Sequence, residues 1–190
     1  MTARSLQVVS DVEPDLAKIL LSKCSEFILK YIRALKETGV DGIIMAEPAA
    51  GLLSNDDATI FSTNYIKPIV EAVQDENFLF VLHNCGNTGH CTQSMIDSGA
   101  RALHFGNQCD IVSALQQVPS DRIVMGNLDP VGIFKLSYPK QVYDETERLL
   151  HATADFDNFI ISTGCDVPPG VSLENINAFY RAVEIFRNRH

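Results

Sequence analysis

The stretch Phe80-Val81-Leu82-His83-Asn84-Cys85-Gly86 ends an apolar run with an imidazole and a thiol, one residue apart. A second stretch, Ile160-Ile161-Ser162-Thr163-Gly164-Cys165-Asp166, ends another apolar run with another cysteine. Short apolar runs that stop at glycine predict buried strands. Since the C-terminal ends of parallel strands gather at one rim of a sheet, we expect His83, Cys85 and Cys165 to meet there.

Imidazole and thiolate are ligands that zinc prefers, and three protein ligands with an open fourth position are typical of catalytic zinc sites. Such a site favours chemistry on a soft ligand such as a thiol. Simpler explanations remain open, because a buried cysteine often serves as a small hydrophobe and a strand-end histidine can be merely hydrogen-bonded. The long gap between Cys85 and Cys165 also resembles no zinc-finger spacing, so the site depends on the fold.

The rest of the chain alternates between short apolar runs and stretches of helical periodicity. Strands are expected at residues 42–46, 78–82, 102–105, 123–125 and 159–162. Helices are expected from Pro14 to the stop at Gly39, at 66–73, 94–98, 110–117 and 139–154, and after the cap residue Ser172. This alternation predicts an α/β fold of about five parallel βα units, with helices on both faces of the sheet.

Three details of the helices are expected. The opening helix should turn its apolar stripe toward the core rather than toward a partner; the stripe consists of Leu16, Ile19, Leu20, Phe27, Ile28, Tyr31, Ile32 and Leu35. The final helix should bury Ile176, Phe179, Tyr180, Val183 and Phe186. Pro68 must lie in a first turn or at a kink, because it has no backbone N–H to donate.

The composition limits the classes of partner. The chain has 190 residues and a formal net charge of −9, so no basic stripe is available for a nucleic acid. No apolar stretch is long enough to span a membrane. Five cysteines without a short-spaced framework, and no recognisable signal peptide, lead us to expect a reducing cytoplasm.

Several other polar residues are expected at the same rim as the H-x-C pair. They are Glu47, Asn87, Asn107, Asn127, Asp129 and Asp166. Glu47 is either a fourth metal ligand or a strand-end residue that bonds a loop. Asp129 precedes Pro130 and is either catalytic or a helix cap. Asn87 and Asn127 either bind a substrate or cofactor or form turns. We assign no role to Cys24, Cys91, Cys109, His90 or His104.

With these residues in place, the chain resembles the uroporphyrinogen decarboxylase superfamily, and within it the zinc-dependent methylcobamide:coenzyme M methyltransferase branch. Order and spacing agree over nearly the entire chain. The segments that carry the resemblance are Gly39-Val40-Asp41-Gly42, Ala46-Glu47-Pro48-Ala49, His83-Asn84-Cys85-Gly86-Asn87-Thr88, Met125-Gly126-Asn127-Leu128-Asp129-Pro130, Gly164-Cys165-Asp166-Val167-Pro168-Pro169 and Leu173-Glu174-Asn175.

The resemblance implies a partial TIM (β/α)₈-type barrel, with residues 1–190 forming one domain that lacks the N-terminal strands of the family. It implies that His83, Cys85 and Cys165 bind zinc. Asp166 would orient one of these ligands without binding the metal itself. Glu47 is the available fourth carboxylate, since Asn107 stands where some relatives carry glutamate. The implied reaction is methyl transfer from methylcobalamin, or from a methylated corrinoid on a separate corrinoid protein, to a small-molecule thiol.

Two alternatives accompany this reading. One is the metal-free decarboxylation of a tetrapyrrole, which gives the superfamily its name. The other is a non-catalytic subunit or fragment of a split barrel. An open five-stranded remnant would expose sheet edges and barrel-lining side chains. We therefore expect a homo-oligomer or a complementing N-terminal half-barrel.

Overall fold

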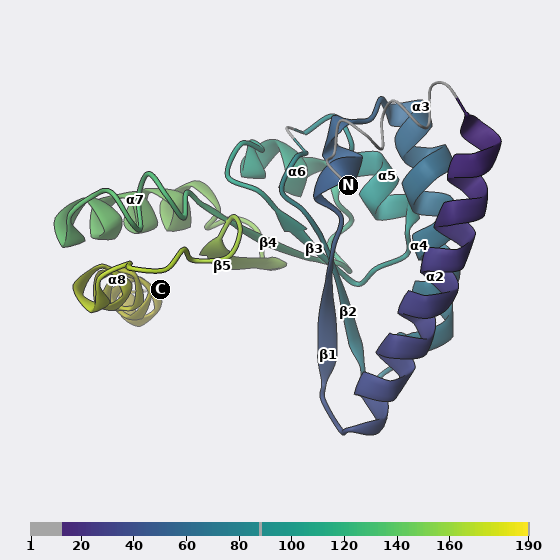
Figure 1. Ribbon diagram of the computed structural model, residues 1–190. Helices are drawn as coiled ribbons and strands as arrows, with labels where there is room; N and C mark the ends of the chain where they lie inside the picture. Colours follow the sequence, from purple (N-terminus) through teal and green to yellow (C-terminus); the bar gives the residue numbers. More distant parts are fainter. Residues whose placement is uncertain (1–12, 88, 190) are drawn as a thin grey trace.

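A single parallel sheet of five strands, in the order β1-β2-β3-β4-β5, organises the computed structural model (Figure 1), which describes residues 13–189 except residue 88. Each strand pairs in parallel with the next one along the chain. The strands are β1 (Gly42–Ala46), β2 (Leu79–Asn84), β3 (Ala102–Phe105), β4 (Ile123–Leu128) and β5 (Phe159–Thr163). The predicted five-stranded parallel fold is thus confirmed.

The helices follow the predicted alternation. They are α2 (Pro14–Glu37), α3 (Asn55–Ala58), α4 (Asn64–Val73), α5 (Thr92–Asp97), α6 (Ile111–Gln117), α7 (Pro139–Ala152) and α8 (Leu173–Arg189). A 3₁₀ turn, η1 (Pro48–Leu52), follows β1. Ser172 accepts a hydrogen bond from the backbone N–H of Asn175, which confirms the predicted cap. None of the described helices combines the length and apolar character that a bilayer crossing requires.

The two faces of the sheet differ, which corrects the expectation of helices on both. Phe80 and Leu82 of β2 and Leu103 of β3 point to the helix side and are 0–1% exposed in the main core. On the opposite face, Ile44 of β1 is 62% exposed and Ile160 of β5 is 47% exposed. The helices therefore cover one face, and the other is the concave wall of an incomplete barrel.

Two apolar helix stripes are only partly buried, contrary to expectation. In α2, Ile32 is buried, whereas Leu16, Ile19, Leu20, Phe27 and Tyr31 are 39–69% exposed. In α8, Phe179 packs against the core, but Tyr180 is 64% exposed. The physical reason is that α2 packs mainly on α4, at the β1 edge of the sheet, and no described element covers its outer side.

Pro68 lies inside α4 rather than in its first turn. The segment that directly precedes α4, η2 (Thr59–Thr63), has π-helical hydrogen bonding. A wider helical turn is one way in which a chain accommodates a local break in the regular hydrogen-bond ladder. Pro68 is therefore not in the first turn, a kink at Pro68 stays a prediction, and the π-helical segment was not expected.

Candidate metal centre

His83, Cys85 and Cys165 come together at the C-terminal rim of the sheet. One potential ligand atom from each lies within 4.8 Å of the other two. His83 belongs to β2, Cys85 follows it directly, and Cys165 follows β5, so the fold joins residues 80 positions apart. Both cysteines are free thiols. The three side chains open onto a cavity of about 630 Å³ on the concave face of the sheet.

Two glycines make this convergence possible. A Cβ atom on Gly106, which follows β3, would lie 2.5 Å from the carbonyl oxygen of Cys85. A Cβ atom on Gly164 would lie 2.4 Å from the backbone nitrogen of Asn107. Only glycine lets these loops approach so closely. They hold Cys85 and Cys165 at neighbouring points of the rim.

One ring nitrogen of His83 has hydrogen-bond partners, and the other has none among the described residues. It is buried, with 6% of the residue exposed. Its Nδ1 lies 3.2 Å from the carbonyl oxygen of His104 and 2.7 Å from the ring Nδ1 of His104. Its Nε2 is buried and has no hydrogen-bond partner in the described part of the chain. A buried nitrogen without a partner costs free energy unless a ligand satisfies it, so this donor set fits a thiophilic metal such as zinc.

Burial controls the charge of these groups. It raises the pKa of the Cys85 thiol, and the nearby Cys165 raises it further. Burial also lowers the pKa of His83, while its contact with the His104 carbonyl and the charge of Asp166 oppose that shift. His83 is therefore neutral at pH 7, which is the form that binds metals. Asp166 is exposed and lines the cavity close enough to influence both histidines.

His104 is the site residue that the sequence analysis passed over. It lies on β3 directly beside His83, with the ring centroids 4.5 Å apart. Its Nε2 lies 2.8 Å from the carbonyl oxygen of Thr163 and 3.0 Å from Oγ of Ser162, on β5. A signal was present. His104 stands two positions before Gly106 at the rim, as His83 stands two positions before Cys85. The alternation of side chains along a strand then turns both histidines to the same face of the sheet.

Glu47 lies at the rim but does not join the cluster. Its backbone N–H donates to the His83 carbonyl, while its carboxylate accepts a hydrogen bond from the Ser62 hydroxyl. Burial raises the pKa of Glu47 to about 7, and the Ser62 contact opposes that rise. The three-residue cluster does not include it, so the geometry matches the strand-end alternative more closely than the role of fourth ligand.

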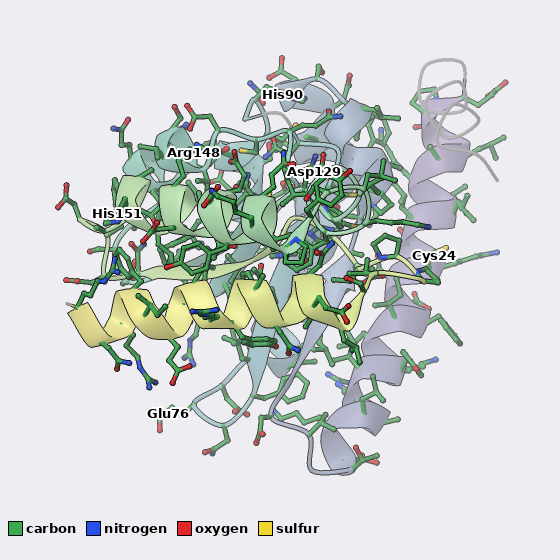
Figure 2. The ribbon with its side chains drawn as sticks, turned by 90° about the vertical axis from the view of Figure 1, so that its left-hand side faces the viewer. Cys24, Glu76, His90, Asp129, Arg148 and His151 are labelled. Atoms are coloured by element: carbon green, nitrogen blue, oxygen red, sulfur yellow. The ribbon has the colours of Figure 1, made fainter. Side chains whose placement is uncertain are left out.

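Asp129 shapes the loop after β4. Its Oδ1 accepts hydrogen bonds from the backbone N–H groups of Val131 and Gly132. These contacts close a turn and do not cap a helix, because the next described helix, α7, begins only at Pro139. Figure 2 shows Asp129 among the loops near the N-terminal end of α7, opposite His151. It does not line the cavity that holds the cluster.

Asn87 and Asn127 have structural partners. Asn87 is fully buried and accepts from the backbone N–H groups of Gly89 and Cys91. Asn127 donates to the carbonyl oxygens of Gly106 and Cys109, which fixes the loop after β3. The geometry favours turn formation for both. Thr88, in the segment that carried the resemblance, lies outside the described residues.

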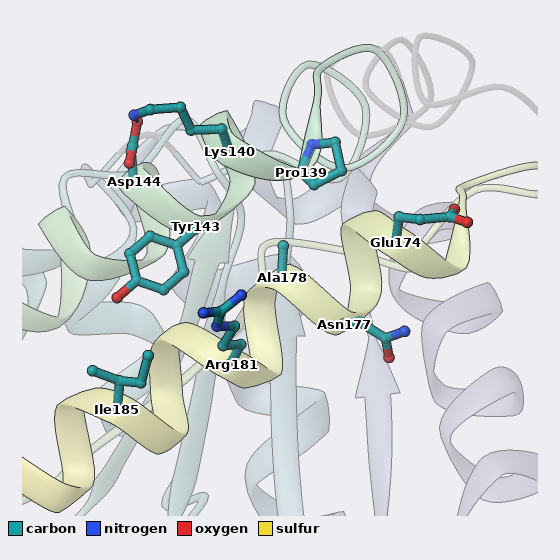
Figure 3. A pocket seen from close by; sticks show the side chains of 9 residues that line it. All are labelled: Pro139, Lys140, Tyr143, Asp144, Glu174, Asn177, Ala178, Arg181 and Ile185. Atoms are coloured by element: carbon teal, nitrogen blue, oxygen red, sulfur yellow. The ribbon is translucent and has the colours of Figure 1, made fainter.

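The remaining cysteines lie apart from the cluster. Cys24 is exposed on α2, where Figure 2 shows it on the outer helix. Cys91 and Cys109 are buried, and burial raises the pKa of each, to about 11 for Cys109. A separate groove lies between α7 and α8, with Tyr143 and Arg181 on its walls (Figure 3). It contains none of the predicted site residues.

Comparison with known proteins assigns the family. Residues 6–186 match the uroporphyrinogen decarboxylase (URO-D) family. The chain belongs to this family. It is 28% identical over 175 residues to the methylcobamide:CoM methyltransferase MtbA of Methanosarcina mazei, and 30% identical over 176 residues to MtbA of Methanosarcina acetivorans. It is also 26% identical over 175 residues to a uroporphyrinogen decarboxylase of Serratia proteamaculans.

These alignments cover 91%, 92% and 90% of the chain, but only 50%, 50% and 49% of the relatives. The chain thus spans about half the length of the curated relatives it matches. The same proportion holds for a solved methyltransferase from Methanosarcina mazei. That structure superposes with a TM-score of 0.86 at 24% identity, covering 98% of this chain and 54% of the other. The superposition confirms the partial barrel.

Proposed function

We propose that this chain carries the zinc site of a URO-D family methyltransferase, which moves a methyl group from a methylated corrinoid to a small thiol. The observation that carries the proposal is the convergence of His83, Cys85 and Cys165 on an open cavity, with a bare imidazole nitrogen among them. His83 Nε2 and the two sulfurs would hold the ion. The bound zinc would favour the thiolate form of a coordinated thiol, which is its nucleophilic form.

The other residues of the site would bind the reactants and accept the thiol proton. The cavity beside the cluster is lined by apolar side chains such as Ile44 and Met125. Both reactants would reach the cluster from this cavity. The substrate sulfur would form a bond to the methyl carbon while the cobalt–carbon bond breaks, with its electron pair staying on the cobalt of the donor. The thiol proton leaves before that step. Asp166 is the carboxylate among the residues that line the cavity, and it would accept the proton.

Decarboxylation of a tetrapyrrole is the second candidate, because uroporphyrinogen decarboxylases are among the relatives. A substrate with several carboxylates calls for cationic side chains. Within the described residues, no lysine or arginine lines the cavity beside the cluster. The cysteine pair also has no task in a metal-free decarboxylation. Both considerations favour methyl transfer.

The first test is zinc binding by the purified chain. We expect one zinc per chain, and we expect His83→Ala, Cys85→Ala and Cys165→Ala each to abolish stoichiometric binding. Cys24→Ala is the matched control and should bind normally, because Cys24 is exposed on α2. Affinity should fall as pH drops, since the Cys85 thiol must lose its proton to bind zinc.

The second test is activity. The zinc-loaded chain, together with the half-barrel that its relatives possess, should demethylate methylcobalamin in the presence of a small thiol. Cys85→Ala should lose this activity. If the assembly instead decarboxylates a porphyrinogen and Cys85→Ala retains that activity, the second candidate is correct and the methyltransferase proposal is wrong.

A further inference from the structure

A chain of hydrogen bonds leads from the end of β5 through two histidines to the proposed metal site. It begins at the Thr163 carbonyl, two residues before Cys165. The His104 Nε2 lies 2.8 Å from that oxygen, and the His104 Nδ1 lies 2.7 Å from the His83 Nδ1. The His83 Nε2 has no hydrogen-bond partner among the described residues. Both rings are buried, with 9% of His104 and 6% of His83 exposed. Water is therefore a poor substitute for either contact.

The direction of the protons follows from the two carbonyls. A carbonyl oxygen can only accept, so the Thr163 oxygen requires a proton on the His104 Nε2. A neutral imidazole carries one N–H, which leaves the His104 Nδ1 as an acceptor. The His83 Nδ1 must then donate, and the His104 carbonyl at 3.2 Å imposes the same requirement. The reverse arrangement would set a lone pair against a carbonyl oxygen at both ends.

We propose that His104 is a positioning residue that keeps His83 in its Nδ1–H tautomer, so that the His83 Nε2 presents a lone pair to the Cys85 and Cys165 sulfurs. Ser162 completes the arrangement, because its hydroxyl lies 3.0 Å from the His104 Nε2 and also donates to the Thr163 carbonyl. A histidine that binds a metal commonly donates its other N–H to a fixed acceptor, which orients the ring and increases its basicity. Here the ring of His104 supplies that acceptor.

The role given to His104 rests on the proposed metal site. The protonation of the two histidine rings can be tested without metal. In the metal-free protein, nitrogen NMR of the histidine rings distinguishes protonated from bare ring nitrogens. We expect His83 to be protonated at Nδ1 and bare at Nε2, and His104 to be protonated at Nε2 and bare at Nδ1. A proton on the His83 Nε2 or on the His104 Nδ1 would overturn the assignment. This measurement needs no variant, so it does not depend on a mutant folding.

Zinc affinity provides the second measurement, with two variants of similar shape. Asparagine places its amide oxygen near the position of a histidine Nδ1, whereas leucine offers no acceptor. His104→Leu should weaken zinc binding by roughly ten- to a hundredfold, while His104→Asn should recover most of the affinity. His151→Leu is the control, because it makes the same change on α7, outside the residues that line this cavity.

The outcomes separate the two proposals. If His104→Leu binds zinc as tightly as the wild type, His104 does not position His83 and the inference is wrong. If the wild type shows the expected protonation of both rings but binds no zinc, the histidine chain stands and the proposed function fails. If both measurements agree with expectation, the chain of hydrogen bonds is part of the metal site.

Discussion

At the residue scale, the sequence identified the candidate metal ligands but not the residues that hydrogen-bond to them or lie beside them. The H-x-C pair and the later cysteine each end an apolar run, so the parallel-sheet rule brought them together. Glu47 could not be assigned from the sequence, because whether its carboxylate turns toward the cluster or toward Ser62 depends on packing. His104 was not assigned a role, because that role depends on its contact with His83 on the neighbouring strand.

Glu47 provides a prediction about pH. Its pKa is about 7 in the folded chain and near 4.5 when unfolded, so the folded state retains a proton that the unfolded state releases between these values. Stability should therefore fall as pH rises from about 4.5 to about 7, by at most about 3 kcal/mol. Glu47→Gln should remove this loss and make the protein more stable at pH 8. Urea unfolding at several pH values measures it.

The exposed Glu76, in the turn before β2 (Figure 2), is the matched position. Glu76→Gln should leave the pH profile of the wild type unchanged. An identical profile for Glu47→Gln and the wild type would mean that the buried carboxyl does not control this dependence.

At the element scale, strands were predictable because each short apolar run is bounded by turn-forming residues and alternates with a helical stretch. Residues 42–46 and 102–105 were predicted with the bounds that the structure has. The helical stripes were less informative, since periodicity identifies an apolar side but not what covers it. Five large apolar residues of α2 that were assigned to the core are exposed. The π-helical turn before α4 has no sequence signal beyond Pro68.

The loop that follows β3 should be sensitive to a single methyl group. Gly106→Ala would place a Cβ atom 2.5 Å from the Cys85 carbonyl oxygen, so the backbone beside the cluster must shift. We expect a loss of about 1–3 kcal/mol in unfolding free energy, together with weaker zinc binding. Denaturant titration and a zinc competition assay measure the two effects.

Gly170→Ala is the control for this change. Gly170 has a φ of +83° and open space around its Cβ position, so alanine there costs backbone strain, about 1–2 kcal/mol, but no clash. Zinc affinity should be unchanged. Equal zinc affinity in Gly106→Ala and the wild type would show that the close approach of this loop does not hold the site in place.

At the scale of the whole molecule, the chain has the architecture of part of a barrel. Its concave face exposes Ile44 and Ile160, and the outer side of α2 exposes Phe27 and Tyr31. Large apolar side chains are usually exposed in number only where another chain or segment covers them. Because the relatives are about twice as long, we propose that a complementing half-barrel or a second copy covers these surfaces.

Association should therefore depend on these side chains. We expect sedimentation of the isolated chain to show self-association at micromolar concentration, and Phe27→Glu with Tyr31→Glu to weaken it. Lys30→Glu is the control for added negative charge on the same helix. A monomer at all concentrations, unaffected by these changes and indifferent to an added N-terminal half-barrel, would contradict the proposed interface.

We propose that His83, Cys85 and Cys165 form one zinc site with an open position. X-ray absorption at the zinc edge of the loaded protein tests it most directly. We expect two sulfur ligands at about 2.3 Å and an imidazole nitrogen at about 2.0–2.1 Å, with a further light atom from water or buffer. Addition of a small thiol should raise the count to three sulfurs. A shell of oxygen and nitrogen alone, or a spectrum unchanged by Cys85→Ala, would contradict the claim.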